Sequence, residues 1–136
     1  MKDIKIFRVI FGGDFEKQIS RLVRKKKFYL LPDQIDEVIE NFEKGNFTGD
    51  FDGDEILRVE TPIPYSIYKL RLPNPDADAG KSNGYRLIYL MVSENALVVL
   101  LAIYYKKEIA DVSDNYVKDL ADGYFLGLLP EPDDTE

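Results

Sequence analysis

The feature that most constrains the fold is a pair of apolar segments, residues 85–92 and 96–105, separated only by Ser93-Glu94-Asn95. Both segments have the length of strands and are rich in β-branched and aromatic residues, and the short polar connection favours an antiparallel hairpin. Nearly continuous apolar runs are typical of strands that are covered on both faces. We therefore expect this hairpin, Tyr85–Val92 and Ala96–Tyr105, at the centre of a sheet.

Periodicity predicts the elements around the hairpin. Strands are expected at residues 4–11, 56–60 and 65–72, and helices at residues 14–26, from Pro32 to Gly45, and from Ser113 onward. Asp14 and Ser113 are expected to cap the first and last helices. The order strand, helix, helix, several strands, helix predicts a compact α+β domain with helices packed on a mostly antiparallel sheet.

The length of 136 residues fits one domain, which we expect over residues 1–129, followed by a disordered acidic tail at 130–136. The sequence has no cysteine and no histidine, which excludes disulfides and Ser-His-Asp catalysis and removes the commonest metal ligands. We expect no metal and no small-molecule cofactor. The longest apolar run is too short to cross a bilayer and no apolar leader follows Met1, so we expect no membrane contact and a cytoplasmic location.

The net charge of -7 argues against nucleic-acid binding when it is taken alone, but the charges are unevenly distributed. Residues 1–31 carry nine Lys/Arg against three Asp/Glu, whereas residues 32–60 carry two against ten and residues 106–136 three against nine. We therefore expect separate basic and acidic regions. The basic run at 24–27 is more typical of a solvated helix end than of a phosphate site.

Three motifs follow one another within residues 65–113. They are Tyr68-Lys-Leu-Arg-Leu72, Gly80-Lys-Ser-Asn-Gly-Tyr-Arg-Leu-Ile-Tyr89 and Ile103-Tyr-Tyr-Lys-Lys-Glu-Ile-Ala-Asp-Val-Ser113. In this order the chain resembles the RelE/HigB branch of the RelE/ParE toxins, and the strand-helix-helix opening also fits that fold. The chain departs from the family pattern in its acidic net charge, its acidic second helix, and Asn83 where glycine is common.

The resemblance implies a RelE-like domain and the toxin of a bacterial type II toxin–antitoxin pair. Such a toxin is most often an endoribonuclease that cuts mRNA on the ribosome without a metal and so inhibits translation. The implied partners are a cognate antitoxin, the ribosome and mRNA. By the same resemblance, basic groups and one tyrosine surround the RNA: Lys69, Arg71, Lys81, Arg86, Lys106, Lys107 and Tyr104.

The residue types fit the chemistry of metal-free RNA cleavage, which needs a base for the 2′-OH, cations for the phosphorane and a proton donor for the leaving oxygen. Lys69 and Arg71 lie two apart on one strand and therefore share a face. Arg86 is the first candidate for transition-state stabilisation, because a guanidinium can hold two phosphate oxygens at once. Lys69, Lys106 and Tyr104 are the candidates for proton transfer, with the assignment among them open.

The loop between the strands of the first and second motifs supplies two further binding candidates. Lys81 is flanked by glycines and is expected to close over the RNA backbone, where Ser82 would add a hydrogen bond. Asp50, Asp52 and Asp54 form one stretch where a cation could bind, although a calcium loop needs a denser pattern.

Other interpretations of the same residues stay open. Arg86 could be a buried structural cation paired with Glu108 or Asp111, and these two carboxylates are expected to hold the junction between the sheet and the last helix. Lys69 and Arg71 could simply solvate one face of the sheet. For the whole protein, the alternatives are a toxin that binds DNA gyrase, as ParE-like members do, and a degenerate, non-catalytic protein-binding module.

Overall fold

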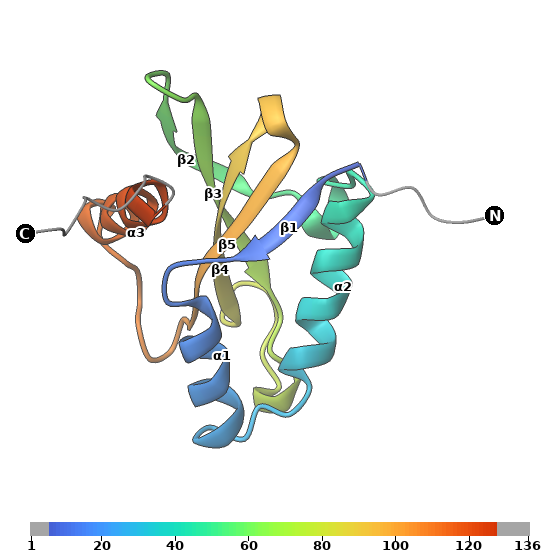
Figure 1. The fold of residues 1–136 in the computed structure, drawn as a ribbon. Helices are drawn as coiled ribbons and strands as arrows, with labels where there is room; N and C mark the ends of the chain where they lie inside the picture. Colours follow the sequence, from blue (N-terminus) through green and yellow to red (C-terminus); the bar gives the residue numbers. More distant parts are fainter. Residues whose placement is uncertain (1–5, 128–136) are drawn as a thin grey trace, which may run out of the picture.

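The computed structural model describes residues 6–127, and Figure 1 shows the arrangement of their helices and strands. The elements in chain order are β1 (Arg8–Phe11), α1 (Phe15–Arg24), α2 (Leu31–Glu43), η1 (Gly49–Phe51), β2 (Asp54–Val59), β3 (Tyr65–Leu72), η2 (Pro75–Ala77), β4 (Tyr85–Val92), η3 (Ser93–Asn95), β5 (Leu97–Tyr105) and α3 (Asp114–Gly127). The elements marked η are single turns of 3-10 helix. The predicted α+β class is confirmed. The predicted tail at 130–136 lies outside the described residues.

A five-stranded sheet in the order β1-β5-β4-β3-β2 forms the centre of the fold. β4 and β5 pair antiparallel and lie inside the sheet, as predicted for the apolar hairpin. The other neighbouring pairs are also antiparallel, except that β1 runs parallel to β5. β5 begins at Leu97 rather than at Ala96, because Ala96 closes the hairpin turn with a left-handed φ of 48°.

Helices cover both faces of the sheet. α1 and α2 pack on one face, where Phe15 and Phe42 are fully buried against alternate residues of the three middle strands. α3 packs on the opposite face through Val117 and Ala121, and Figure 1 shows it on the far side of the sheet from α2. Within residues 6–127, no helix combines the length and the apolar character that a membrane span requires.

The starts of α1 and α3 differ in how they are capped. Ser113 caps α3 as predicted, since its Oγ accepts a hydrogen bond of 3.0 Å from Tyr116 N. Asp14 precedes α1 but makes no side-chain capping bond. Its carboxylate instead accepts a hydrogen bond of 2.9 Å from the hydroxyl of Tyr116, a residue 102 positions later. Asp14 therefore joins two helices rather than capping one.

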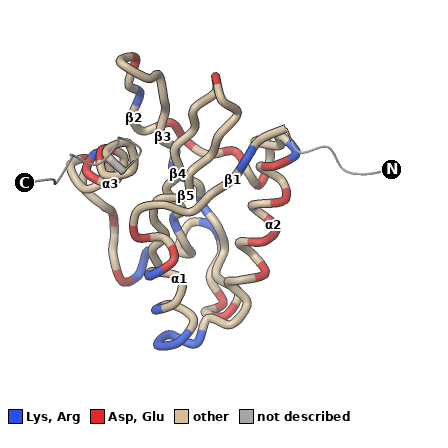
Figure 2. The backbone as a smooth tube through the Cα atoms, in the orientation of Figure 1, with Lys and Arg blue, Asp and Glu red and all other residues tan. Residues whose placement is uncertain are grey.

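Basic and acidic side chains occupy different parts of the molecule. Figure 2 shows Lys and Arg positions gathered around the end of α1 and the nearby strand ends, whereas Asp and Glu positions run along α2. This agrees with the uneven charge distribution in the sequence. An anionic ligand would therefore be attracted to one end of a protein whose net charge is -7.

Candidate functional site

A row of three polar side chains crosses β3, β4 and β5. Arg71 is paired in register with Arg86, and Arg86 is paired with Tyr104. Directly opposed residues of neighbouring strands point to the same face of a sheet, and Tyr104 packs with the core on the α3 face. We call Arg71, Arg86 and Tyr104 the cross-strand row. Lys69, two residues before Arg71 on β3, points to the same face.

The carboxylate of Asp111 ties two of these side chains together. Its Oδ1 atom accepts hydrogen bonds from Lys69 Nζ at 2.8 Å, from the Tyr104 hydroxyl at 3.0 Å and from Val112 N at 2.9 Å. The bond from Lys69 is the main reason that the pKa of Asp111 lies below its usual range. Asp111 belongs to the connection between β5 and α3, so it holds that junction against the sheet, as expected from the sequence.

Tyr104 is a hydrogen-bond donor rather than a base in this setting. Its side chain is only 3% exposed, and this burial, together with the bond to Asp111, raises the pKa of its hydroxyl well above the ordinary value for tyrosine. A phenol with a raised pKa keeps its proton at neutral pH. Tyr104 can therefore donate to a phosphate oxygen, but it is poorly suited to deprotonate a 2′-OH.

Arg86 is buried, with 4% of its surface exposed. Its Nη1 donates to the carbonyl oxygens of Lys81 at 2.7 Å and Tyr85 at 3.1 Å, and its Nη2 donates to that of Ser82 at 2.9 Å. A guanidinium has five N–H groups, so two of them bond to no residue in the described part of the chain. Arg86 thus organises the loop before β4 and keeps donors for another ligand.

The pairing of Arg86 with Glu108 or Asp111 is not formed within residues 6–127, where carbonyl oxygens take the hydrogen bonds. Asp111 acts on Arg86 only as a nearby charge, which raises the pKa of the guanidinium, while burial has the larger effect and lowers it. Glu108 instead pairs with Arg21 at 2.8 Å and Lys26 at 3.5 Å. Glu108 therefore holds the connection after β5 to the end of α1.

Lys81 is engaged with a different element. Its ammonium pairs with the carboxylate of Asp50 in η1, so closure over an RNA backbone requires this ion pair to open. Gly84 shapes the loop, because a Cβ there would lie 2.1 Å from Leu72 O and 2.9 Å from Asn74 N. Within residues 6–127, at Asp50 or elsewhere, no three acidic side chains gather closely enough to hold a metal ion.

Lys106 and Lys107 directly follow β5 at the same end of the sheet. Lys106 N donates a hydrogen bond of 2.9 Å to the carbonyl of Gly84, which joins the two loops beside the row. Lys107 is exposed and Lys106 half-buried. Neither ammonium bonds to a residue in the range 6–127, so both cations stay available to a ligand.

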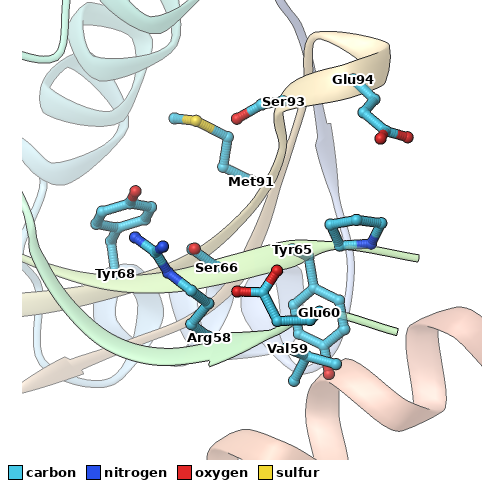
Figure 3. A pocket seen from close by; sticks show the side chains of 10 residues that line it. Arg58, Val59, Glu60, Tyr65, Ser66, Tyr68, Met91, Ser93 and Glu94 are labelled. Atoms are coloured by element: carbon cyan, nitrogen blue, oxygen red, sulfur yellow. The ribbon is translucent and has the colours of Figure 1, made fainter. Parts of the chain in front are cut away.

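Two cavities lie away from the cross-strand row. One of ≈ 250 Å³ is lined by Arg58, Tyr68 and Glu94, among others (Figure 3), and Arg58 there donates a hydrogen bond of 3.0 Å to Glu55. The other is an apolar groove of ≈ 650 Å³ between the turn from β2 to β3 and the end of α3. None of the predicted site residues lines either cavity.

The geometry thus brings together four predicted residues, Lys69, Arg71, Arg86 and Tyr104, and places Lys106 and Lys107 at the same end of the sheet. The sequence did not indicate that Asp111 binds two of the predicted site side chains at once. Its only signal was its place inside the third motif.

Comparison with known proteins finds similarity to solved structures. No protein-family model matches the sequence, and no curated protein matches it. Among solved structures, a chain of the crystal structure of the archaeal RelE–RelB complex from Pyrococcus horikoshii OT3 is similar to this chain, with a TM-score of 0.46 and 18% sequence identity. The match covers 74% of this chain and 96% of that chain.

Proposed function

We propose that this protein is the toxin of a type II toxin–antitoxin pair and cuts mRNA on the ribosome without a metal. The cross-strand row carries the proposal, because three strands hold Arg71, Arg86 and Tyr104 side by side on one face, with Lys69 next to them. The same four residues belong to the motifs that resemble RelE/HigB toxins. Backbone pairing in a sheet holds such a constellation rigidly, as phosphate chemistry requires.

Each side chain has a role in the proposed reaction. Lys69 and Arg71 bind the phosphate that is attacked, and the free N–H groups of Arg86 add positive charge where the phosphorane forms. Tyr104, which keeps its proton, donates a hydrogen bond to a phosphate oxygen. Lys69 and Lys106 are the candidates for moving protons between the 2′-OH and the leaving oxygen.

Residues around the row bind the flanking RNA backbone in this proposal. Lys106 and Lys107 extend the positive charge beyond β5, and Lys81 and Ser82 lie in the loop that Arg86 holds. Such backbone contacts carry affinity and position the strand, whereas they carry little sequence information. The ribosome would then supply the context in which a codon is presented to the row.

An antitoxin partner is part of the same proposal. A protein that silences this site has to neutralise the cations around the row, so we expect an acidic segment in the antitoxin. Co-expression with the neighbouring gene product and size-exclusion chromatography test this. A stable complex that elutes ahead of either protein is expected. Separate elution of the two proteins would contradict the proposed antitoxin partner.

A second candidate function is a non-catalytic protein-binding module. It is favoured because three of the proposed site side chains already have partners: Lys69 and Tyr104 bond to Asp111, and Arg86 bonds to three carbonyl oxygens. A module of this kind would neither cut RNA nor slow growth when it is overproduced.

End-mapping of a labelled mRNA in a cell-free translation reaction, with and without ribosomes, tests the proposal. The wild type is expected to cut only when ribosomes are present. Tyr104→Phe keeps the ring in place and should reduce cutting about tenfold or more, since one donor to the developing charge is lost. Lys69→Gln should act in the same direction.

Lys118→Gln is the matched control, because it removes one exposed cation from α3 without touching the row. It should cut as the wild type does. Intact mRNA with every protein, from samples that are folded by circular dichroism, would refute the nuclease proposal and favour the binding module.

A further inference from the structure

The connection between β5 and α3 places a carboxylate where the proposed reaction needs a phosphate. This inference rests on the proposed function and concerns the regulation of the same site. We infer that Asp111 is an internal competitor of the RNA phosphate: it occupies a subsite formed by Lys69 Nζ and the Tyr104 hydroxyl, and RNA binds there by displacing it.

The geometry of the bonds at Asp111 is the first argument. Lys69, Tyr104 and Val112 N all donate to one oxygen, at distances of 2.8, 3.0 and 2.9 Å. An ammonium, a phenol and a backbone N–H that converge on one anionic oxygen form a binding site for an anion. A non-bridging phosphate oxygen accepts the same bonds as a carboxylate oxygen does.

The placement of donors and acceptor is the second argument. Lys69 and Tyr104 lie inside β3 and β5, so the sheet holds them in position when the acceptor leaves. Asp111 lies in an irregular connection, and 63% of its side chain is exposed. Exposed ion pairs contribute little to stability, so the bond is weak enough for a ligand with more negative charge to replace it.

The charges around the subsite are the third argument. Arg71 and Arg86 lie on the same face as Lys69 and Tyr104, and neither forms an ion pair with a residue of the range 6–127. Asp111 supplies one negative charge, whereas Lys69, Arg71 and Arg86 supply three positive charges. A backbone phosphate that takes its place would meet the remaining positive charge of the row, which favours the exchange.

The substitution Asp111→Asn separates the two functions of the carboxylate. In Asp111→Asn the amide oxygen still accepts the hydrogen bond from Val112 N, so the local turn is kept, while the negative charge that holds Lys69 is lost. Asp119→Asn is the matched control, because it removes one exposed carboxylate from α3. Both variants raise the net charge by one.

The affinity for a 2′-O-methyl RNA oligonucleotide, which cannot be cut through its 2′ position, is measured by fluorescence anisotropy. Asp111→Asn should bind about three- to fivefold more tightly than the wild type, and Asp119→Asn less than about twofold. The gain should disappear when Asp111→Asn is combined with Lys69→Gln, because the subsite is then incomplete.

A second readout uses inorganic phosphate and the NMR signal of the Val112 amide. In Asp111→Asn this amide should shift at lower phosphate concentration than in the wild type, because the subsite has lost its internal anion. The control Asp119→Asn should titrate as the wild type does.

The outcomes separate this inference from the proposed function. Equal RNA affinities of Asp111→Asn and Asp119→Asn, with binding that Lys69→Gln weakens, would overturn the competition by Asp111 and leave the nuclease site standing. A phosphate-dependent shift of Val112 without RNA binding by any variant would support the subsite and overturn RNA as its ligand. If neither the phosphate-dependent shift of Val112 nor RNA binding is observed, both the competition by Asp111 and the nuclease site are overturned.

Discussion

At the scale of single residues, the site depends on backbone atoms as much as on side chains. A buried guanidinium is costly unless its N–H groups find acceptors, and Arg86 finds them in three carbonyl oxygens of residues 81–85. At Gly84 the loop that carries two of these carbonyls passes close to Leu72 and Asn74. The position of Arg86 therefore rests on a glycine two residues away.

Gly84→Ala is expected to destabilise the protein by about 2 kcal/mol or more, because its Cβ would meet three backbone atoms, and backbone cannot yield as a side chain does. Urea unfolding followed by circular dichroism measures the loss. Gly80→Ala in the same loop is the control, since its Cβ would have no atom within 4 Å. Equal stability of the two variants would show that the loop can relax.

Asp111 makes stability depend on pH. Its folded pKa is lowered, chiefly by the bond from Lys69, so its contribution is fully present above the unfolded value and is lost as the pH falls through the folded pKa. Asp111→Asn should thus cost under about 1 kcal/mol at neutral pH, because the carboxylate of the pair is largely exposed. The difference from the wild type should shrink below about pH 4. Urea unfolding at several pH values checks this, and a constant difference would contradict it.

At the scale of the elements, one glutamine links three of them. β1 pairs with β5 as far as Leu100, and Asp14 N then donates to Leu101 O, so the N–H of Ile103 needs another acceptor. Gln18 of α1 provides it, because its Oε1 accepts a hydrogen bond of 2.8 Å from Ile103 N. Its Nε2 donates at 3.0 Å to the hydroxyl of Tyr116 in α3. Gln18 thus connects the central sheet with the helices on both of its faces.

Gln18→Met is expected to lower the free energy of unfolding by about 1–3 kcal/mol, because it keeps the side-chain volume but leaves the N–H of buried Ile103 without an acceptor. Lys17→Met, on the exposed side of the same helix, should change it by less than about 0.5 kcal/mol. Chemical denaturation measures the free energy of unfolding of both variants. Similar losses in the two variants would show that water replaces the lost acceptor.

Elements with a strong local pattern could be predicted from the sequence. β3 and β4 begin and end at the predicted residues, since alternation and continuous apolar runs are local signals. The sequence also placed Arg71, Arg86 and Tyr104 on strands, but the register that aligns them in a row is visible only in the structure. The roles of Gln18 and Asp111 could not be predicted, since their bonds to Ile103 and Lys69 cross 85 and 42 positions of the chain. Such bonds depend on how elements pack.

At the scale of the whole molecule, the charge distribution matters more than the net charge. The protein carries a net charge of -7, yet many of its Lys and Arg positions gather around the end of α1 and the nearby strand ends (Figure 2). Screening limits the reach of surface charges to about 10 Å at 0.1 M salt. An RNA strand at the basic end therefore responds mainly to the cations there, while the acidic α2 opposes only an approach from its own side.

The salt dependence of RNA binding tests this separation. Each phosphate contact to single-stranded RNA adds about 0.7 to the slope of log K against log salt concentration. Replacing both Lys106 and Lys107 by Gln should therefore reduce the magnitude of the slope by about 1.4, measured by anisotropy with the 2′-O-methyl oligonucleotide at several KCl concentrations. Lys118→Gln on α3 should leave the slope unchanged. Lys118→Gln removes one cation and the double variant removes two. If Lys118→Gln lowered the magnitude of the slope by half as much as the double variant does, RNA would be responding to net charge, and the basic end would not be the binding surface.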